Sequence, residues 1–151
     1  MHVLIVDDEQ KMCELVSRWL TPDGHDILQA HDAEAALTIL EQQPVAVVLC
    51  DRSMPGKDGD WLVAQVRQRF PDVAVILATA DDAVPARISM QEGVLGYLVK
   101  PFRADQVRGA VNDAIAWHQA AARSPHRQPR DADRLDAFLR RAGRPEPKGK
   151  A

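Results

Sequence analysis

The chain has 151 residues, of which 46% are hydrophobic and 27% are charged, and its formal net charge is −3 at pH 7. This length and composition are typical of one soluble globular domain. The sequence has no signal-peptide pattern, no apolar run near the roughly 18 residues that a membrane-spanning helix needs, and no metal-ligand spacing among its five histidines. We therefore expect a cytoplasmic protein with no membrane contact, in which Cys13 and Cys50 are reduced and buried.

Strand and helix patterns alternate from the start of the chain. The segments with a strand pattern are residues 2–6, 25–30, 45–51, 73–78 and 95–99. The segments with helical spacing of apolar residues are 11–20, 33–43, 58–70, 85–92 and 104–121. Strands that alternate with helices form βαβ units with right-handed crossovers, which place the strands in a parallel sheet. The predicted fold class is therefore α/β, with helices on both faces of a five-stranded parallel sheet.

Residues 45–51, with the sequence VAVVLCD, are the segment around which this sheet is built. Five apolar residues and a cysteine run without interruption into Asp51, and turn residues follow. A continuous apolar run bounded by turn residues is typical of a strand buried on both faces. Open α/β sheets bind their ligands beyond the carboxyl ends of the strands. Asp51 is thus either part of a ligand site or a cap of the following turn, where Asp is also common.

Three further predicted strands also deliver polar groups at their carboxyl ends. These groups are Asp7, Asp8 and Glu9 after the first strand, Thr79 and Asp81 after the fourth, and Lys100 after the fifth. Carboxylates that share one crevice repel each other and raise the pKa of at least one of them, unless a cation lies between them. A few oxygen ligands with room for water suit Mg²⁺, and a lysine pairs with an anion. The four strand ends together predict Mg²⁺-assisted phosphoryl transfer in this crevice.

Four motifs make the pattern more specific: LIVDDE at 4–9, CDRSMPGKDG at 50–59, LATA at 77–80 and GYLVKPF at 96–102. In this order and spacing they resemble the receiver domain of two-component response regulators, over roughly residues 1–120. The resemblance implies a flavodoxin-like sheet with the strand order 2-1-3-4-5. It implies a response regulator in phosphorelay signal transduction, which is not an enzyme beyond slow self-dephosphorylation.

The resemblance also implies a role for individual residues at the strand ends. Asp51 would accept a phosphoryl group from a histidine kinase or a phosphotransfer protein, and Thr79 and Lys100 would hold the phosphoryl oxygens. Thr79 and Tyr97 would be the switch residues. The peptide bond between Lys100 and Pro101 would be cis, which requires a proline.

The implied cofactor is Mg²⁺. Asp8 would bind it directly together with Asp51, Asp7 would bind it through water, and the carbonyl oxygen of Arg52 would complete the protein ligands. The implied output is a downstream protein partner, or a homodimer, that contacts the fourth helix, the fifth strand and the fifth helix. No core position of the family pattern is missing from this sequence.

Three other functions fit parts of the pattern. A nucleotide-binding Rossmann domain is excluded because no G-x-G-x-x-G motif follows the first strand and no P-loop lysine is present. A phosphatase with an aspartyl nucleophile would need a general acid near Asp51, and Ser53 is poorly suited to that role. A scaffold or DNA-associated module that keeps the fold without being phosphorylated stays open as the rival class of function.

Ser53 and Asp81 are predicted to set the lifetime of the phosphorylated state. Each lies two positions beyond a site residue, Ser53 after Asp51 and Asp81 after Thr79. In the family, side chains at these places line the path by which water reaches the acyl phosphate. A small serine leaves that path open and a short acid can orient a water, so a short-lived phosphate is expected. The alternative is that both are ordinary loop residues.

The end of the chain differs in charge from the rest. Residues 1–118 contain 10 basic and 18 acidic residues, a net charge of −8, whereas residues 119–151 contain 9 basic and 4 acidic residues, a net charge of +5. A DNA-binding output domain needs roughly 50 residues or more. We therefore expect a receiver domain at 1–121, followed at 122–151 by a basic tail rich in Pro and Arg, with no separate output domain.

Within this tail, residues 131–142 are expected to form a short amphipathic helix. Acids at its start, arginines at its end and the following Gly143 are helix signals, and Leu135, Phe138 and Leu139 form an apolar stripe. Helices this short are marginal alone. The segment is thus either a frayed, solvated tail or docks on this domain, on a second copy or on another protein. Nucleic-acid binding is disfavoured, because the acidic domain beside the tail repels phosphate.

Overall fold

Five parallel strands form one sheet in the order β2-β1-β3-β4-β5 in the computed structural model, which describes residues 1–80 and 94–123. The strands are β1 (His2–Val6), β2 (Asp26–Ala30), β3 (Val45–Asp51), β4 (Ala74–Thr79) and β5 (Val94–Val99). Each neighbouring pair in this order is parallel. The α/β class and the flavodoxin-like strand order predicted from the sequence are therefore confirmed.

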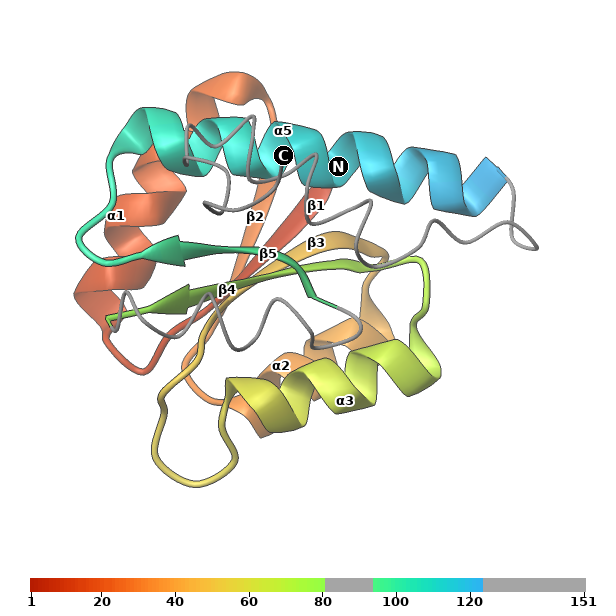
Figure 1. Cartoon of the computed structure of the whole chain (residues 1–151), viewed down its shortest axis with the longest axis horizontal. Helices are drawn as coiled ribbons and strands as arrows, with labels where there is room; N and C mark the ends of the chain where they lie inside the picture. Colours follow the sequence, from red (N-terminus) through yellow and green to blue (C-terminus); the bar gives the residue numbers. More distant parts are fainter. Residues whose placement is uncertain (81–93, 124–151) are drawn as a thin grey trace, which may run out of the picture.

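Helices cover both faces of the sheet (Figure 1). They are α1 (Gln10–Leu20), α2 (Ala33–Gln42), α3 (Gly59–Arg69) and α5 (Ala104–Arg123), with a short 3-10 turn, η1 (Thr21–Asp23), after α1. α1 and α5 pack on one face, and α2 and α3 pack on the other. The helices predicted at 85–92 and 131–142 lie outside the described residues.

The core consists of two apolar layers, one on each side of β3. All seven residues of β3 are buried. Val48 and Cys50 pack in the layer beneath α2 and α3, whereas Val47 and Leu49 pack in the layer beneath α1 and α5. Successive side chains of a strand point to opposite faces, so an unbroken apolar run supplies both layers. Each fully buried Val or Leu contributes about 1.5–3 kcal/mol relative to an exposed one, which fixes β3 at the centre of the sheet.

The helix boundaries differ from the predicted ones by one or two residues, and capping explains the start of α3. The helix predicted from residue 58 begins at Gly59, because the Asp58 side chain caps it by accepting a hydrogen bond from the Trp61 N–H at 2.9 Å. Asp32 caps α2 in the same way, through the Ala35 N–H. α5 continues to Arg123, two residues beyond the predicted end at 121.

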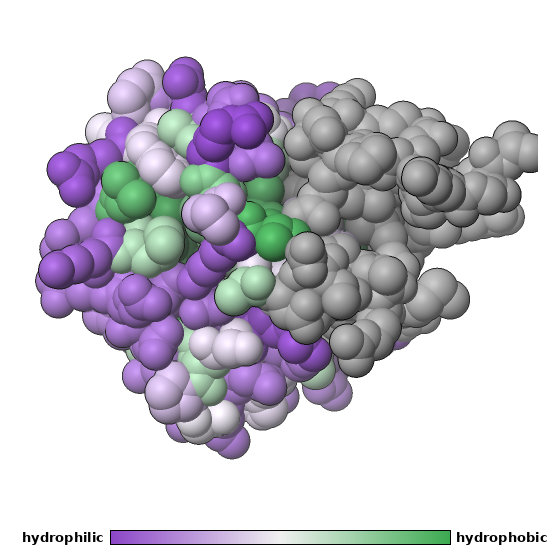
Figure 2. Space-filling view, turned by 60° about the vertical axis from the view of Figure 1, so that its left-hand side comes forward, coloured by the Kyte–Doolittle hydropathy of each residue, from purple (hydrophilic) through white to green (hydrophobic). Residues whose placement is uncertain are grey.

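The surface of the described residues is mainly polar. Figure 2 shows a face that is largely hydrophilic, with hydrophobic residues gathered near its middle. Met1 is the one large hydrophobic residue of the described ranges that is exposed, at 45%. None of the helices within 1–80 and 94–123 combines the length and apolar character needed to span a membrane.

Candidate functional site

Three carboxylates meet at the carboxyl edge of the sheet. Asp51 is the last residue of β3, and Asp7 and Asp8 directly follow β1, its neighbour in the sheet. One carboxylate oxygen from each residue lies within 4.8 Å of the other two. Asp7 and Asp51 are buried, at 3% and 8% exposure, while Asp8 is exposed to solvent. The parallel sheet thus brings together the three acids that the sequence predicted at one crevice.

Hydrogen bonds fix both the backbone and the side chain of Asp7. Its N–H donates to the Ala30 carbonyl at 3.1 Å, which continues the pairing with β2 beyond the strand end. Its side-chain Oδ1 accepts a hydrogen bond from the Glu9 N–H at 2.9 Å. The Cys13 thiol and His31 Nδ1 lie 3.4 and 3.3 Å from its carbonyl oxygen. Sequence reasoning did not find this brace, because Cys13 and His31 approach Asp7 only in the folded chain.

Lys100 joins two of the acids. Its Nζ lies 3.2 Å from Asp7 Oδ2 and 3.3 Å from Asp51 Oδ2. The Lys100 N–H donates to the Thr79 carbonyl at 2.7 Å, and the peptide bond to Pro101 is cis, as predicted. Burial lowers the pKa of the Lys100 ammonium, but the two carboxylates outweigh it, so the pKa is raised from its ordinary value. Lys100 is therefore fully charged at neutral pH.

The surroundings favour the charged form of Lys100 but disfavour the charged form of Asp51. Burial raises the pKa of Asp51, and the Asp7 charge adds to that effect, against the lowering by Lys100 and by the Ser53 N–H, which donates to Asp51 Oδ1 at 3.2 Å. The net result is a pKa above the ordinary value. The charged form of Asp51 is thus less stable here than in water, because burial and the Asp7 charge together outweigh the stabilisation by Lys100 and the Ser53 N–H.

The arrangement fits a divalent cation. Asp7, Asp8 and Asp51 carry three negative charges when ionised, and Lys100 supplies one positive charge, which leaves two negative charges in the crevice. Carboxylate oxygens are the ligands that Mg²⁺ prefers, and exposed Asp8 leaves one side open to water. The donor set therefore fits the predicted magnesium site.

The Arg52 carbonyl, predicted as a further ligand, is already a hydrogen-bond acceptor. The Gly59 N–H at the start of α3 donates to it at 3.0 Å. Gly59 packs so closely here that a Cβ atom would lie 2.8 Å from both Arg52 Cα and the Asp51 carbonyl oxygen. Sequence reasoning missed Gly59, although its place directly after the capping residue Asp58 marks the entry of α3. A carbonyl oxygen has two lone pairs, so this hydrogen bond leaves one free, and the Arg52 carbonyl stays in the proposed ligand set.

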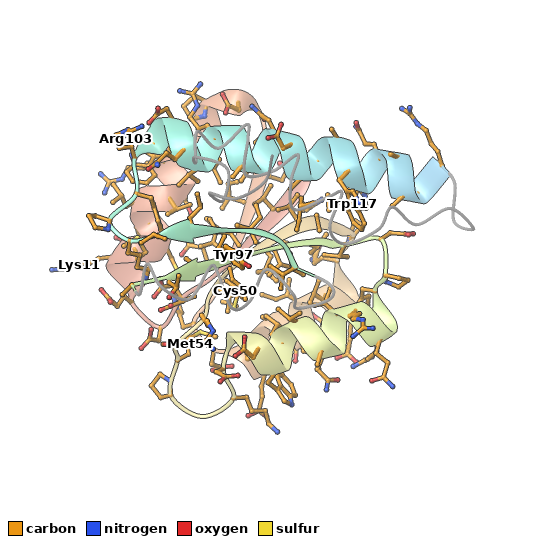
Figure 3. The ribbon with its side chains drawn as sticks, viewed as in Figure 1. Lys11, Cys50, Met54, Tyr97, Arg103 and Trp117 are labelled. Carbon is orange, nitrogen blue, oxygen red and sulfur yellow. The ribbon has the colours of Figure 1, made fainter. Side chains whose placement is uncertain are left out.

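The residues predicted to switch are both buried. Thr79 ends β4 and is 5% exposed. Tyr97 in β5 is fully buried in the apolar layer beneath α2 and α3, which also contains Cys50 (both labelled in Figure 3). The strand predicted to end at 78 includes Thr79, because Thr79 pairs with Val99 of β5. Ser53 is exposed in the loop after β3. Asp81, the other residue predicted to set the phosphate lifetime, lies outside the described residues.

Both cysteines are free and buried, as predicted. Burial raises the pKa of the Cys13 thiol to about 11, with Asp7 adding to the effect. Burial likewise raises the pKa of Cys50, next to Asp51. Both side chains are therefore neutral thiols at physiological pH and do not act as nucleophiles beside the acids.

Comparison with known proteins identifies the family. The model of the response regulator receiver domain matches residues 3–112. The response regulator FleR of Pseudomonas aeruginosa is 38% identical over 117 residues, covering 77% of this chain and 24% of FleR. The transcriptional regulatory protein AruR of the same species is 34% identical over 135 residues, covering 84% of this chain and 55% of AruR. The chain thus spans between about a quarter and about half of the length of these relatives.

Solved structures give the same answer. A response regulator receiver domain protein from Clostridium thermocellum superposes with a TM-score of 0.72 at 29% identity, covering 79% of this chain and 97% of that one. The signal receiver domain of an HD domain-containing protein from Pseudomonas fluorescens gives a TM-score of 0.74 at 27% identity, covering 81% and 91%. The chain belongs to the family of response regulator receiver domains of two-component systems.

Proposed function

We propose that this chain is a Mg²⁺-dependent phosphoacceptor of a phosphorelay, with Asp51 as the residue that is phosphorylated. The observation that carries the proposal is the position of Lys100, whose ammonium lies between the oxygens of Asp7 and Asp51 while Asp8 borders the same crevice. A nucleophilic carboxylate, a fixed cation and two further acids are the groups that phosphoryl transfer requires.

The reaction follows from the positions of these side chains. A carboxylate oxygen of Asp51 attacks phosphorus, the bond from phosphorus to the donor's histidine nitrogen breaks, and an acyl phosphate forms. Asp8 and Asp51 would hold a Mg²⁺ ion directly, Asp7 would hold it through water, and the Arg52 carbonyl would complete the protein ligands. The ion would supply positive charge to the phosphoryl oxygens. Lys100 is close enough to Asp51 to exchange its carboxylate partner for a phosphoryl oxygen, and Thr79 at the end of the neighbouring strand offers a hydroxyl.

The phosphorylated domain acts as a conformational switch that controls a protein partner. Thr79 is one strand away from Asp51, and Tyr97 pairs with Leu77 of the same strand β4. A movement of Thr79 can therefore displace β5, which pairs with β4, and the adjacent α5. The proposed input partner is a histidine kinase or phosphotransfer protein. The proposed output partner is a downstream protein or a second copy, which binds β5, α5 and residues 85–92, where the sequence predicts a helix.

The phosphorylated state is proposed to decay by self-hydrolysis and to be comparatively short-lived. Ser53 is exposed beside Asp51 and leaves room for an attacking water. Ser53→Arg is expected to prolong the phosphate, and a tenfold slowing corresponds to only about 1.4 kcal/mol of barrier. The test compares the rate of dephosphorylation of the wild-type protein with the rates of Ser53→Arg and Asp81→Ala, at fixed Mg²⁺ and pH. Wild-type decay in both variants would show that neither position sets the lifetime.

The phosphoacceptor role is tested with acetyl phosphate and Mg²⁺, followed by intact mass measurement. We expect one phosphate adduct that hydroxylamine removes and that Asp51→Ala does not form. An adduct that persists in Asp51→Ala would contradict the assignment. Beryllofluoride then separates the switch from an unphosphorylated scaffold, because a bound mimic that leaves the amide spectrum of β5 and α5 unchanged would favour the scaffold.

A further inference from the structure

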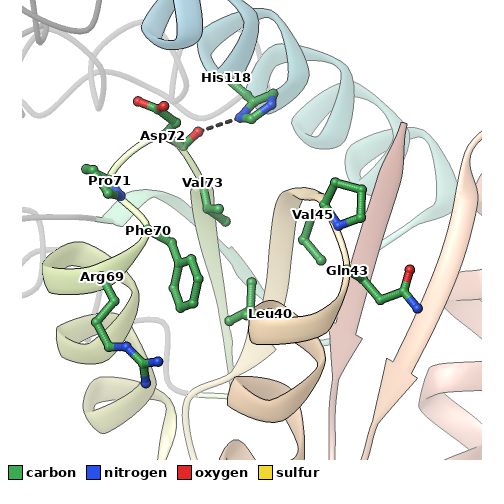
Figure 4. Close-up of a pocket in the computed structure, with 10 residues that line it drawn as sticks. Leu40, Gln43, Val45, Arg69, Phe70, Pro71, Asp72, Val73 and His118 are labelled. Carbon is green, nitrogen blue, oxygen red and sulfur yellow. Dashed lines mark hydrogen bonds between the residues drawn. The ribbon is translucent and has the colours of Figure 1, made fainter.

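A groove opens at the amino edge of the sheet, at the opposite end from the acidic crevice. It has a volume of about 430 Å³ and lies between the ends of α2 and α3, the starts of β3 and β4, and His118 of α5 (Figure 4). Its apolar lining is formed by Leu40, Pro44, Val45, Phe70, Pro71 and Val73. Such an apolar groove with a polar rim is a candidate surface for an apolar side chain of another segment.

Polar contacts connect the elements that surround this groove. His118 Nδ1 donates a hydrogen bond to the Asp72 carbonyl, which ties α5 to the turn before β4. Arg69 forms an ion pair with Glu41, which ties α3 to α2. Each contact joins two different elements across the rim. The groove is therefore a formed feature of the fold, rather than a gap that its own lining side chains close.

The end of α5 lies close enough to this groove for the chain that follows it to reach the groove. Arg123 lies five residues beyond His118, which is about 7.5 Å along a helix. Seven residues, 124–130, separate Arg123 from Asp131, and the eight residue steps between the two span up to about 26–29 Å when the chain is extended. The segment at 131–142 can therefore return to the groove without strain in the connection.

The chemistry of residues 131–142 suits the groove. Leu135, Phe138 and Leu139 fall on one face at helical spacing, and that face needs an apolar partner because a helix this short is marginal alone. Residues 131–142 contain three acids and three arginines and have no net charge, but residues 119–151 as a whole carry +5, opposite to the −8 of residues 1–118. Opposite net charges raise the local concentration of the tail at the domain surface.

We propose that residues 131–142 dock in this groove of their own domain, with Leu135, Phe138 and Leu139 as the inserted side chains. The groove lies at Val45, the first residue of β3, and the acidic crevice lies at Asp51, the last. A strand of this length separates the two by about 20 Å. The docked segment therefore leaves the phosphorylation crevice open, and the inference stands independently of the proposed function.

A spin label on the full chain tests the docking. Cys13 and Cys50 are buried neutral thiols, so the nitroxide attaches to a cysteine introduced by Ala137→Cys, beside the apolar stripe. We expect paramagnetic broadening of the amide signals of Gln43 and Val73 at the groove, and none at Ser53 beside the acidic crevice. Adding Phe138→Asp to the labelled chain is expected to abolish the broadening at the groove, while the amide spectrum of the rest of the domain stays unchanged.

Mixing labelled, unenriched protein with unlabelled, ¹⁵N-enriched protein identifies the source of the contact. Docking within one chain predicts no broadening in this mixture. Broadening at Gln43 and Val73 in the mixture would overturn the proposal in favour of docking on a second copy. Broadening absent from both samples, or unaffected by Phe138→Asp, would overturn docking of this segment altogether.

Discussion

Lys100 Nζ lies 3.3 Å from Asp51 Oδ2, although Lys100 follows β5, Asp51 ends β3, and β4 lies between these two strands. Neighbouring strands are about 4.8 Å apart, so the lysine reaches across the end of β4 to make this contact. The same ammonium lies 3.2 Å from Asp7, which follows β1 on the far side of β3. The Lys100 side chain thus connects the ends of β5, β3 and β1 at the edge where phosphoryl transfer is proposed.

Removing this ammonium should destabilise the domain. Lys100→Met leaves the buried acids Asp7 and Asp51 without their shared cation, and an unpaired buried charge is expected to cost about 1–3 kcal/mol of unfolding free energy. Lys100→Arg is the matched control, because it keeps the positive charge. Urea unfolding in EDTA measures both variants. Equal stability of Lys100→Met and the wild type would show that the pair contributes nothing.

Neutralising Asp51 should stabilise the metal-free protein in a pH-dependent way. The pKa of Asp51 is raised by burial, so its charged form opposes folding above that pKa, and this cost disappears as pH falls and the acid becomes protonated. Asp51→Asn is therefore expected to be more stable than the wild type at pH 7 in EDTA. The difference should shrink as pH falls toward the ordinary value of 3.8.

Unfolding of both proteins in EDTA across this pH range gives the comparison. If the stability advantage of Asp51→Asn over the wild type instead grew toward acid pH, the prediction would be wrong. That result would mean that the folded state favours the charged form of Asp51 over the protonated one.

Magnesium should stabilise the folded domain through the three acids. A ligand at ten times its dissociation constant stabilises the folded state by about 1.4 kcal/mol, and Mg²⁺ should produce a rise in melting temperature on this scale. Asp8→Asn removes the exposed ligand and should abolish most of the rise. Glu34→Gln, which neutralises an exposed acid on α2, is the matched control. An equal Mg²⁺ response in all three proteins would exclude the crevice as the binding site.

Gly59→Ala should destabilise the domain and disturb Asp51. A Cβ at this position would lie 2.8 Å from the Asp51 carbonyl oxygen, and the backbone must shift to admit it, at a cost of about 1–3 kcal/mol. Gly109→Ala is the control, because nothing lies within 4 Å of the added Cβ and alanine is favoured in a helix by about 0.5–1 kcal/mol. Opposite signs are expected in denaturant unfolding. Destabilisation by both substitutions to the same extent would remove the argument from close packing.

The sequence predicted the parts of the molecule that depend on strand order. The unbroken apolar run of β3 indicated burial on both faces, and polar residues at the ends of other strands indicated a shared crevice at Asp51. Parallel topology alone brings those ends together, so Asp7, Asp8 and Lys100 could be assigned to one site without coordinates.

The parts that sequence reasoning missed depend on contacts between elements. The hydrogen bond from Gly59 to the Arg52 carbonyl arises only when α3 packs against the loop after β3. The brace of Cys13 and His31 on the Asp7 carbonyl likewise joins α1 and the end of β2 across the chain. No local pattern marks such approaches. The boundary at Asp58 was missed for a related reason: an aspartate at this place in the sequence is compatible with both the first residue of a helix and its N-cap.

The most direct test of Asp51 as the phosphoacceptor is borohydride reduction of the protein after incubation with acetyl phosphate and Mg²⁺. Borohydride converts an acyl phosphate of aspartate to homoserine, which remains in the chain and is located by fragmentation of the tryptic peptide that ends at Arg52. The account predicts homoserine at position 51, and none when Mg²⁺ is replaced by EDTA. Homoserine at Asp7 or Asp8 instead, or at no acid of the chain, would contradict it.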